Sequence, residues 1–128
     1  MKIENIKEIS ILAKQKGFVP KIFSTIWTFD SYNGIKDYPM VTNMCDYLLL
    51  CEIQFWLREI HKIHSEALTS NISESIEKSI IIYNSSIITQ DLDIILDTSL
   101  FFHNALSISI LYGLNLLPNI DLINDKNK

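Results

Sequence analysis

Apolar residues recur every three to four positions at the start of the chain, which is the spacing of one face of a helix. The pattern covers residues 3–16, and Gly17 follows at the position where a helix commonly ends in glycine. The next segment, 18–29, is rich in β-branched and aromatic residues and has a proline near its start, so we predict an extended segment or an edge strand. Residues 30–43 contain glycine, proline and asparagine and are predicted to form a loop.

A second helix is predicted from residue 44 to residue 64. One of its faces is apolar and consists of Leu49, Leu50, Ile53, Trp56, Leu57 and Ile60. The first half is apolar on the opposite side as well, which indicates a central helix with neighbours on two sides. The second half, CEIQFWLREIHKIH, adds the only arginine of the chain, two histidines and a cysteine. We interpret this run as scaffold, in which Trp56 and Ile60 help to fill the core and Trp56→Ala costs about 3–5 kcal/mol.

Short β-rich runs follow the second helix. Residues 80–83 form the clearest one, and we pair it with a less distinct strand at 63–69 through the polar connection 70–75. Residues 89–97 are predicted to form a loop or a short turn, with some strand character at 94–96.

The last predicted helix covers residues 100–117, with Thr98 or Ser99 as its N-cap and Pro118 after its end. Gly113 lies beside the apolar row of this helix. Because glycine costs a helix about 1 kcal/mol relative to alanine, we expect it to let another element pack closely.

These elements predict a small α+β domain over residues 1–120, followed by a flexible tail at 121–128. Their order is α-(β)-α-β-β-α, with the helices packed on a short antiparallel β-hairpin. A chain of 128 residues is one domain by the usual size range.

The last helix lies in an uncharged stretch. From residue 98 to residue 120 only His103 can carry a charge, and this length is enough to cross a bilayer. Polar residues interrupt the stretch and aspartates precede it, so we expect no membrane span. Two alternatives stay open: a helix buried within the domain, or a helix that forms the interface of a homodimer.

Cys45 and Cys51 are six residues apart on the second predicted helix, about 9 Å along its axis. A disulfide needs Cα atoms within about 7 Å, so we expect two reduced, buried thiols and a cytoplasmic protein. Burial on an apolar face should raise the pKa of Cys51. The N-terminal segment has no continuous apolar core and is not expected to be a signal peptide.

Candidate groups for chemistry are incomplete. His61 and His64 can share a helix face, but a zinc site needs a third ligand, and Cys51 is about 15 Å away along the helix. The aspartates at 91, 93 and 97 lack the glycine and the terminal glutamate of a calcium loop. Neither a Gly-x-Ser-x-Gly motif nor a glycine-rich phosphate loop is present. We therefore expect no catalytic, cofactor-binding or metal-binding residues, and no enzyme activity.

Charge is unevenly distributed along the chain. The first 78 residues carry ten acids and nine bases, whereas no lysine or arginine lies between Lys78 and Lys126. The net charge of −4 argues against general nucleic-acid binding, which needs bases to neutralise phosphates. An acidic, apolar surface can dock on a basic partner, and the alternative is ordinary solubilising charge. The candidate partner-binding residues are Trp27, as an exposed anchor in its extended segment, and Asp91, Asp93 and Asp97.

Three segments carry a resemblance to a known group of proteins. YLLLCEIQFWLREIHKIH at 47–64 is similar to a signature of small phage and prophage proteins of Bacteroidota, in which Cys-Glu-x-Gln-x-Trp-Leu-Arg runs into His-x-Ile-His and then a strand. ILAKQKGF at 11–18 and FFHNALSISILYGLNLL at 101–117 resemble the opening and closing segments of those proteins. This chain departs from them in its serine- and isoleucine-rich middle strands and in a closing helix without glutamate.

The resemblance implies a small accessory protein of a mobile element and gives no activity to transfer. Since such proteins often bind a host protein, we expect a non-enzymatic inhibitor of host defence in the bacterial cytoplasm. An anti-CRISPR inhibitor of an RNA-targeting type VI CRISPR effector ribonucleoprotein is the most specific form of this expectation. Two alternatives stay open: a nucleic-acid-associated phage regulator, against which the net acidity counts, and a self-assembling structural phage component.

Overall fold

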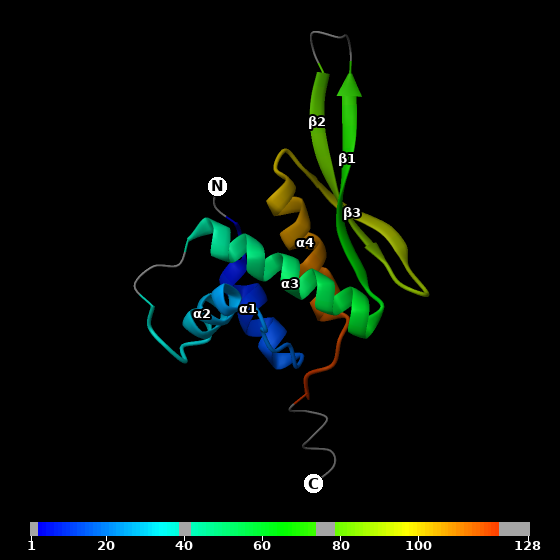
Figure 1. The fold of residues 1–128 in the computed structure, drawn as a ribbon. Helices are drawn as coiled ribbons and strands as arrows, with labels where there is room; N and C mark the ends of the chain where they lie inside the picture. The colour runs from blue at the N-terminus through cyan, green and yellow to red at the C-terminus, as the bar shows by residue number, and fades with distance from the viewer. Residues whose placement is uncertain (1–2, 39–41, 74–78, 121–128) are drawn as a thin grey trace.

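Seven elements make up the computed structural model, which describes residues 3–38, 42–73 and 79–120 (Figure 1). They are α1 (Ile6–Gln15), α2 (Phe23–Tyr32), α3 (Asn43–His61), β1 (His64–Ser73), β2 (Ser79–Ile88), β3 (Asp93–Ser99) and α4 (Phe102–Asn115). The predicted α+β class is confirmed, with one helix and one strand more than the sequence pattern indicated. The tail predicted at 121–128 lies outside the described residues.

Helix α4 lies between the sheet and the other helices (Figure 1). It packs against all three strands on one side and against α1 and α3 on the other. The core between these helices is made of aliphatic side chains: Ile9, Ala13, Leu49, Leu50, Ile53, Leu57, Leu106, Ile110 and Leu114. The uncharged helix of the sequence is therefore a central element of the fold.

Helix α1 ends as its sequence predicted. The backbone N–H of Phe18 donates to the carbonyl of Ala13, and Gly17 takes the left-handed conformation, with φ of +96°. This conformation suits glycine because it has no Cβ.

The prediction of an extended segment at 18–29 is wrong, because most of it folds as α2. Its buried residues, Thr25, Thr28 and Phe29, recur at helical spacing and pack toward α1 and α3. The threonine hydroxyls donate to carbonyls of the preceding turn, at Ile22 and Ser24. Burial of one helical face outweighs the weak β preference of threonine, tryptophan and phenylalanine here.

Helix α3 is confirmed, and its start is capped by the Thr42 hydroxyl, which accepts from the Cys45 N–H. Two details of the predicted core are wrong. Ile60 is 65% exposed, because it lies in the last turn, just before the chain bends into β1. Trp56 is only partly buried, at the margin of the core, with its ring edge-on to Phe18 and His61.

The sheet is antiparallel with the order β1-β2-β3. The predicted hairpin is present, but β1 and β2 pair over ten residues each, so they extend past the helices as an arm (Figure 1). The segment predicted as a loop or turn contains β3. A bulge interrupts the β2–β3 pairing, where Ser85 lies opposite Asp97 but Ser86 lies opposite Ile95.

Small residues let α4 approach the sheet closely. The Ser85 hydroxyl donates to the carbonyl of Ala105, and the Ser109 hydroxyl donates to the carbonyl of Ser86. A Cβ built on Gly113 would lie 2.5 Å from Ser65 Oγ, so the predicted close approach at this glycine is confirmed.

The predicted N-cap of this helix is wrong. The N-cap residue is Phe101, and Ser99 instead accepts from the Phe101 N–H with its hydroxyl. Within the described part of the chain, no helix has the length and apolar character needed to span a membrane.

Candidate protein-binding surface

Trp27 lies on α2 and is 43% exposed. Its ring stacks on Tyr38, with centroids 5.1 Å apart and planes 9° from parallel, and it contacts Phe23 at 4.5 Å. The side chain is thus an exposed aromatic, as predicted, but it is held on a helix and within an aromatic cluster of its own.

The three candidate aspartates belong to one hairpin. Asp91 lies in the turn between β2 and β3, where its N–H donates to the Thr89 hydroxyl, and Asp93 and Asp97 lie on β3. All three are exposed. Helix α2 and strand β3 lie on opposite sides of the molecule, so the structure does not bring Trp27 together with the aspartates (Figure 1).

The aspartates border a sheet face that no described helix covers. Buried residues Ser65, Ser85 and Ile87 point toward α4, so most of the residues that alternate with them point to solvent. Ser86 is an exception, because it is buried although it alternates with Ser85 and Ile87. We call this side the outer sheet face. It comprises His64, Glu66, Leu68, Ile80, Ile82, Ile88, Asp93 and Ile95.

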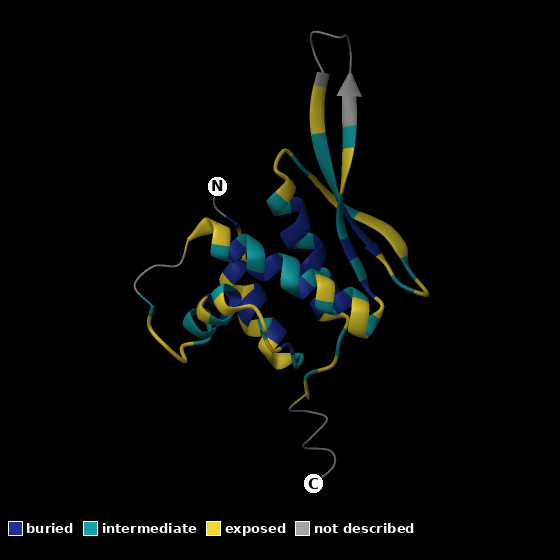
Figure 2. Cartoon of the chain, viewed as in Figure 1, coloured by how far each residue is buried: buried dark blue, intermediate teal, exposed yellow. Residues whose placement is uncertain are grey.

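Large aliphatic side chains are exposed on the outer sheet face. Ile95 is 63% exposed and Ile80 is 53% exposed, and Figure 2 shows exposed segments along the arm and along β3. Glu66 and Asp93 stand among these aliphatic residues. Apolar surface of this kind, rimmed by polar groups, marks interaction sites in many proteins.

Negative charge is concentrated in the segment of the sequence that contains the sheet, residues 64–99. Residues 64–99 carry six acids and one lysine, whereas residues 1–63 carry seven acids and eight bases. Among the described sheet residues the acids are Glu66, Asp91, Asp93 and Asp97, and neither lysine nor arginine occurs. The outer sheet face therefore carries a negative field that the helical part does not share.

The histidines do not form a shared site. His61 packs edge-on against Trp56 at 4.5 Å, and burial lowers its pKa. His64 is the first residue of β1, and its Nδ1 lies 4.0 Å from a carboxylate oxygen of Glu66. Over the described ranges, no group of three or more His, Cys, Asp or Glu side chains is arranged to hold a metal ion.

The two cysteines differ from each other, and both are half-buried rather than buried as predicted. Burial raises the pKa of the Cys51 thiol, as expected. The Thr42 hydroxyl donates to Cys45 Sγ, and this hydrogen bond lowers the pKa of Cys45.

One carboxylate is buried in the helical part. Asp46 accepts a hydrogen bond from the Tyr32 hydroxyl at 3.0 Å, and its pKa is raised by burial. Burial, together with the nearby Asp46, raises the pKa of Tyr32 to about 12. The pair joins the start of α3 to the end of α2.

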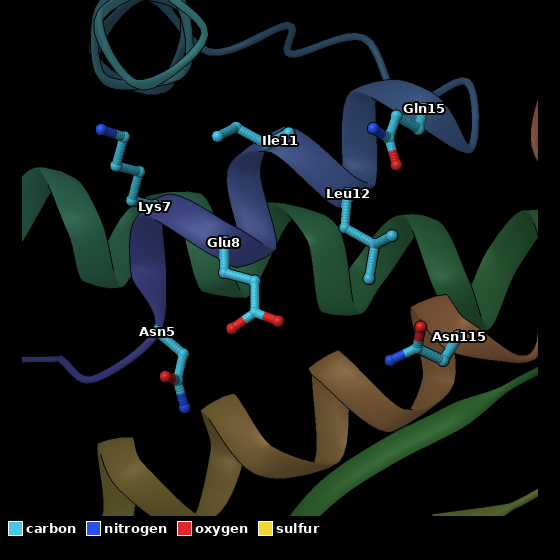
Figure 3. Close-up of a pocket in the computed structure, with 7 residues that line it drawn as sticks. All are labelled: Asn5, Lys7, Glu8, Ile11, Leu12, Gln15 and Asn115. Carbon is cyan, nitrogen blue, oxygen red and sulfur yellow. The ribbon is translucent and has the colours of Figure 1, made fainter.

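A depression between α1 and α4 is a further candidate (Figure 3). Its lining is mixed, with amides, two opposite charges and two aliphatic side chains: Asn5, Lys7, Glu8, Ile11, Leu12, Gln15 and Asn115. Figure 3 shows these side chains spread along the two helices rather than converging on a point. The arrangement resembles a gap between helices more than a catalytic site.

Comparison with protein-family models, with curated proteins and with solved structures found no match for this chain. We single out the outer sheet face because it combines exposed aliphatic side chains with acids that no lysine or arginine of the described sheet balances. The sequence pattern indicated its aspartates but missed its aliphatic residues, because β2 reads IIIYNSSII, without alternation of apolar and polar positions.

Proposed function

We propose that the chain acts without catalysis, by binding a partner protein that has a basic surface, through the outer sheet face. The observation that carries this proposal is the coincidence of exposed aliphatic side chains with the concentrated negative charge on one sheet. Aliphatic groups such as Ile95 supply affinity when they are buried, and the acids steer a basic partner and fix its orientation.

A direct nucleic-acid role is less well supported by this surface. Phosphate binding requires lysine and arginine, and the described sheet residues contain neither. A protein that itself binds nucleic acid presents the opposite charge and therefore suits this face.

The phage-like resemblance narrows the class of partner. We propose a host defence protein, and an RNA-targeting CRISPR nuclease as the first one to test, because its RNA-binding cleft has to be basic. Occupation of such a cleft by an acidic protein would block the nucleic acid by competition.

The test is a pull-down from a Bacteroidota host with three baits: wild type, the double variant Asp93→Lys/Ile95→Ser, and the control Trp27→Ser. Asp93 and Ile95 are exposed, so the double variant should fold, and circular dichroism checks this. We expect a nucleic-acid-binding defence protein with wild type and with Trp27→Ser, and its loss with the double variant.

Purified components then decide the mechanism. A 1:1 complex that weakens with salt, and inhibition of the nuclease by wild type but not by the double variant, would support the proposal. Equal capture by all three baits would contradict the outer sheet face. Recovery of the bait alone, with large oligomers by light scattering, would favour the self-assembling alternative.

A further inference from the structure

The two edge strands of the sheet, β1 and β3, differ in how their outward-facing backbone groups are protected. On β1, one such group is bonded to Gln54 of α3. Its side-chain amide, Nε2, donates to the carbonyl of Ser65 at 2.7 Å. Ser65 lies on β1, an edge strand, and we infer from this bond to α3 that its carbonyl faces away from β2. One outward-facing carbonyl of the edge is thus satisfied within the chain.

The direction of the next backbone groups follows from the ladder. In an antiparallel strand, the N–H and C=O groups of alternate residues point to the same side. Since Ser65 points outward, Ala67 and Thr69 do as well, whereas Glu66 and Leu68 bond to β2. The β2–β3 turn gives the same result. The Thr89 N–H donates to the Leu92 carbonyl, so the backbone groups of Thr89 face β3 and those of the preceding residue, Ile88, face β1. Ile88 is paired with His64, so His64 bonds to β2 and its neighbour Ser65 points outward.

Beyond Ser65 this edge is open. Among the described residues, no hydrogen bond outside the sheet ladder reaches the backbone of Ala67 or Thr69. Leu68 and Thr69 are exposed, and residues 64–73 contain neither proline nor lysine, the residues that most commonly protect an edge, and they contain one acid, Glu66.

The opposite edge is protected. Strand β3 carries a bulge at Leu96, which interrupts regular pairing, and aspartates at positions 93 and 97. Bulges and charges are the usual devices that keep a further strand from adding. A further strand can therefore pair more readily with β1 than with β3.

The geometry points to the β1 edge as the place where an extended, basic segment of a partner protein adds as a fourth strand. Its backbone would bond to the open groups of Ala67 and Thr69. A lysine or arginine would lie beside Glu66 on the outer sheet face, and an apolar residue two positions along would lie beside Leu68. The choice of a basic segment rests on the proposed function, and the open edge rests on the hydrogen bonds alone.

A second copy of this chain fits the edge less well. Strand β1 contains one acid, Glu66, and its one basic side chain is His64, which already lies 4.0 Å from Glu66 in the same strand. A copy of β1 would therefore bring neither lysine nor arginine to Glu66. A basic segment offers the charge that the edge lacks.

The test uses a displayed library of random ten-residue peptides, selected against the full chain. Thr69→Pro removes the outward N–H without removing a ladder hydrogen bond, and Thr69→Val is the control that keeps this N–H. We expect selected peptides to carry a lysine or arginine and, two positions along, an apolar residue. Their affinity should fall about tenfold with Thr69→Pro and stay nearly constant with Thr69→Val.

Hydrogen exchange of the unaltered chain gives a second measurement, which does not depend on the folding of a variant. In the free chain the amides of Ala67 and Thr69 should exchange quickly, and those of Glu66 and Leu68 slowly. A bound peptide should slow the exchange of Ala67 and Thr69.

The outcomes separate this inference from the proposed function. Peptides that bind Thr69→Pro as well as wild type, leave both amides fast, or are absent after selection would overturn strand addition. A concentration-dependent dimer that protects both amides would also overturn it, since a second copy would then fill the edge. Neutral strand-forming peptides, insensitive to salt and to Glu66→Gln, would support the open edge and contradict the basic partner.

Discussion

The helical part, residues 3–61, and the sheet, residues 64–99, differ in which side chains they bury. The helices bury large aliphatic residues such as Leu50 and Ile53 completely. The sheet instead buries small residues, including Ser65 and Ser85, against α4 and leaves isoleucines exposed on its other face. The helices thus supply most of the fully buried aliphatic side chains, although Phe23, Phe55 and Ile60 stay exposed on them, and the sheet holds many of its isoleucines outside the core.

This difference separates stability from recognition. Buried aliphatic area provides most of the free energy of folding, so the helical core should determine whether the chain folds. Exposed isoleucines of the outer sheet face contribute little to that energy, and they stand beside uncompensated acids. Four predictions, from the largest expected effect to the smallest, test the separation.

Leu50→Ala should have the largest effect. The side chain is fully buried, and its truncation leaves a cavity, so we expect a loss of about 2–5 kcal/mol in the free energy of unfolding. Urea denaturation measures it, with Ile95→Ala as the matched control on the sheet. A similar loss of unfolding free energy for Leu50→Ala and Ile95→Ala would contradict the difference between the helical part and the sheet.

Gly113→Ala tests the small-residue contact between α4 and the sheet. The added methyl group would meet Ser65 Oγ at 2.5 Å, and overpacking of this kind costs about 1–3 kcal/mol, partly offset by better helix propensity.

The partner variant is Ser65→Ala, which removes a buried hydroxyl that has no hydrogen-bond partner. It should be neutral or stabilising alone and should reduce the cost of Gly113→Ala in the double variant. Thermal unfolding of the wild type, both single variants and the double variant measures this. If the two effects are additive, the Ser65 hydroxyl is not the group that clashes with the added methyl group.

Asp46→Asn should stabilise the helical part near neutral pH. Burial raises the pKa of Asp46 in the folded chain above its unfolded value, so the folded state binds this proton more tightly. Wild type therefore loses stability as pH rises from the unfolded pKa through the folded pKa, whereas asparagine has no such loss and can still accept from Tyr32.

The gain of Asp46→Asn should shrink as the pH falls below the unfolded pKa of an aspartate. Unfolding free energies measured across this range check it. A gain that is constant with pH would show that ionisation of Asp46 is not its cause.

Ile95→Ser should have the smallest effect on stability, within about 0.5 kcal/mol, because the side chain is exposed. The same variant should weaken capture of the partner. A large loss of stability would assign Ile95 to the core and remove the basis for the outer sheet face.

Parts of this structure were predictable because one local signal sufficed. Apolar periodicity together with Gly17 located α1, and periodicity located most of α3 and α4. Helix α2 was not predicted, since its β-branched and aromatic composition hid the helical spacing of Thr25, Thr28 and Phe29. Those residues are buried against α1 and α3, and packing of one face, rather than local preference, supplies most of the stability of such a helix.

The candidate surface was predictable only in its charges. Exposed aspartates are expected wherever acids cluster without bases. Which isoleucines of the outer sheet face are exposed depends on which residues of β2 point toward α4. That orientation is set by the bulge beside Ser85 and by the burial of serines there, and both are properties of the tertiary structure. No pattern in a run of isoleucines reveals them.

The bulge in β3 also limits stoichiometry. A sheet with two regular edges can pair with a neighbouring molecule at each edge, and repeated pairing of this kind produces fibres. Here a strand added at β1 meets a molecule whose far edge is irregular and charged at positions 93 and 97. If a strand adds at β1 as proposed, we expect addition to stop after one step and to yield a finite complex instead of a polymer.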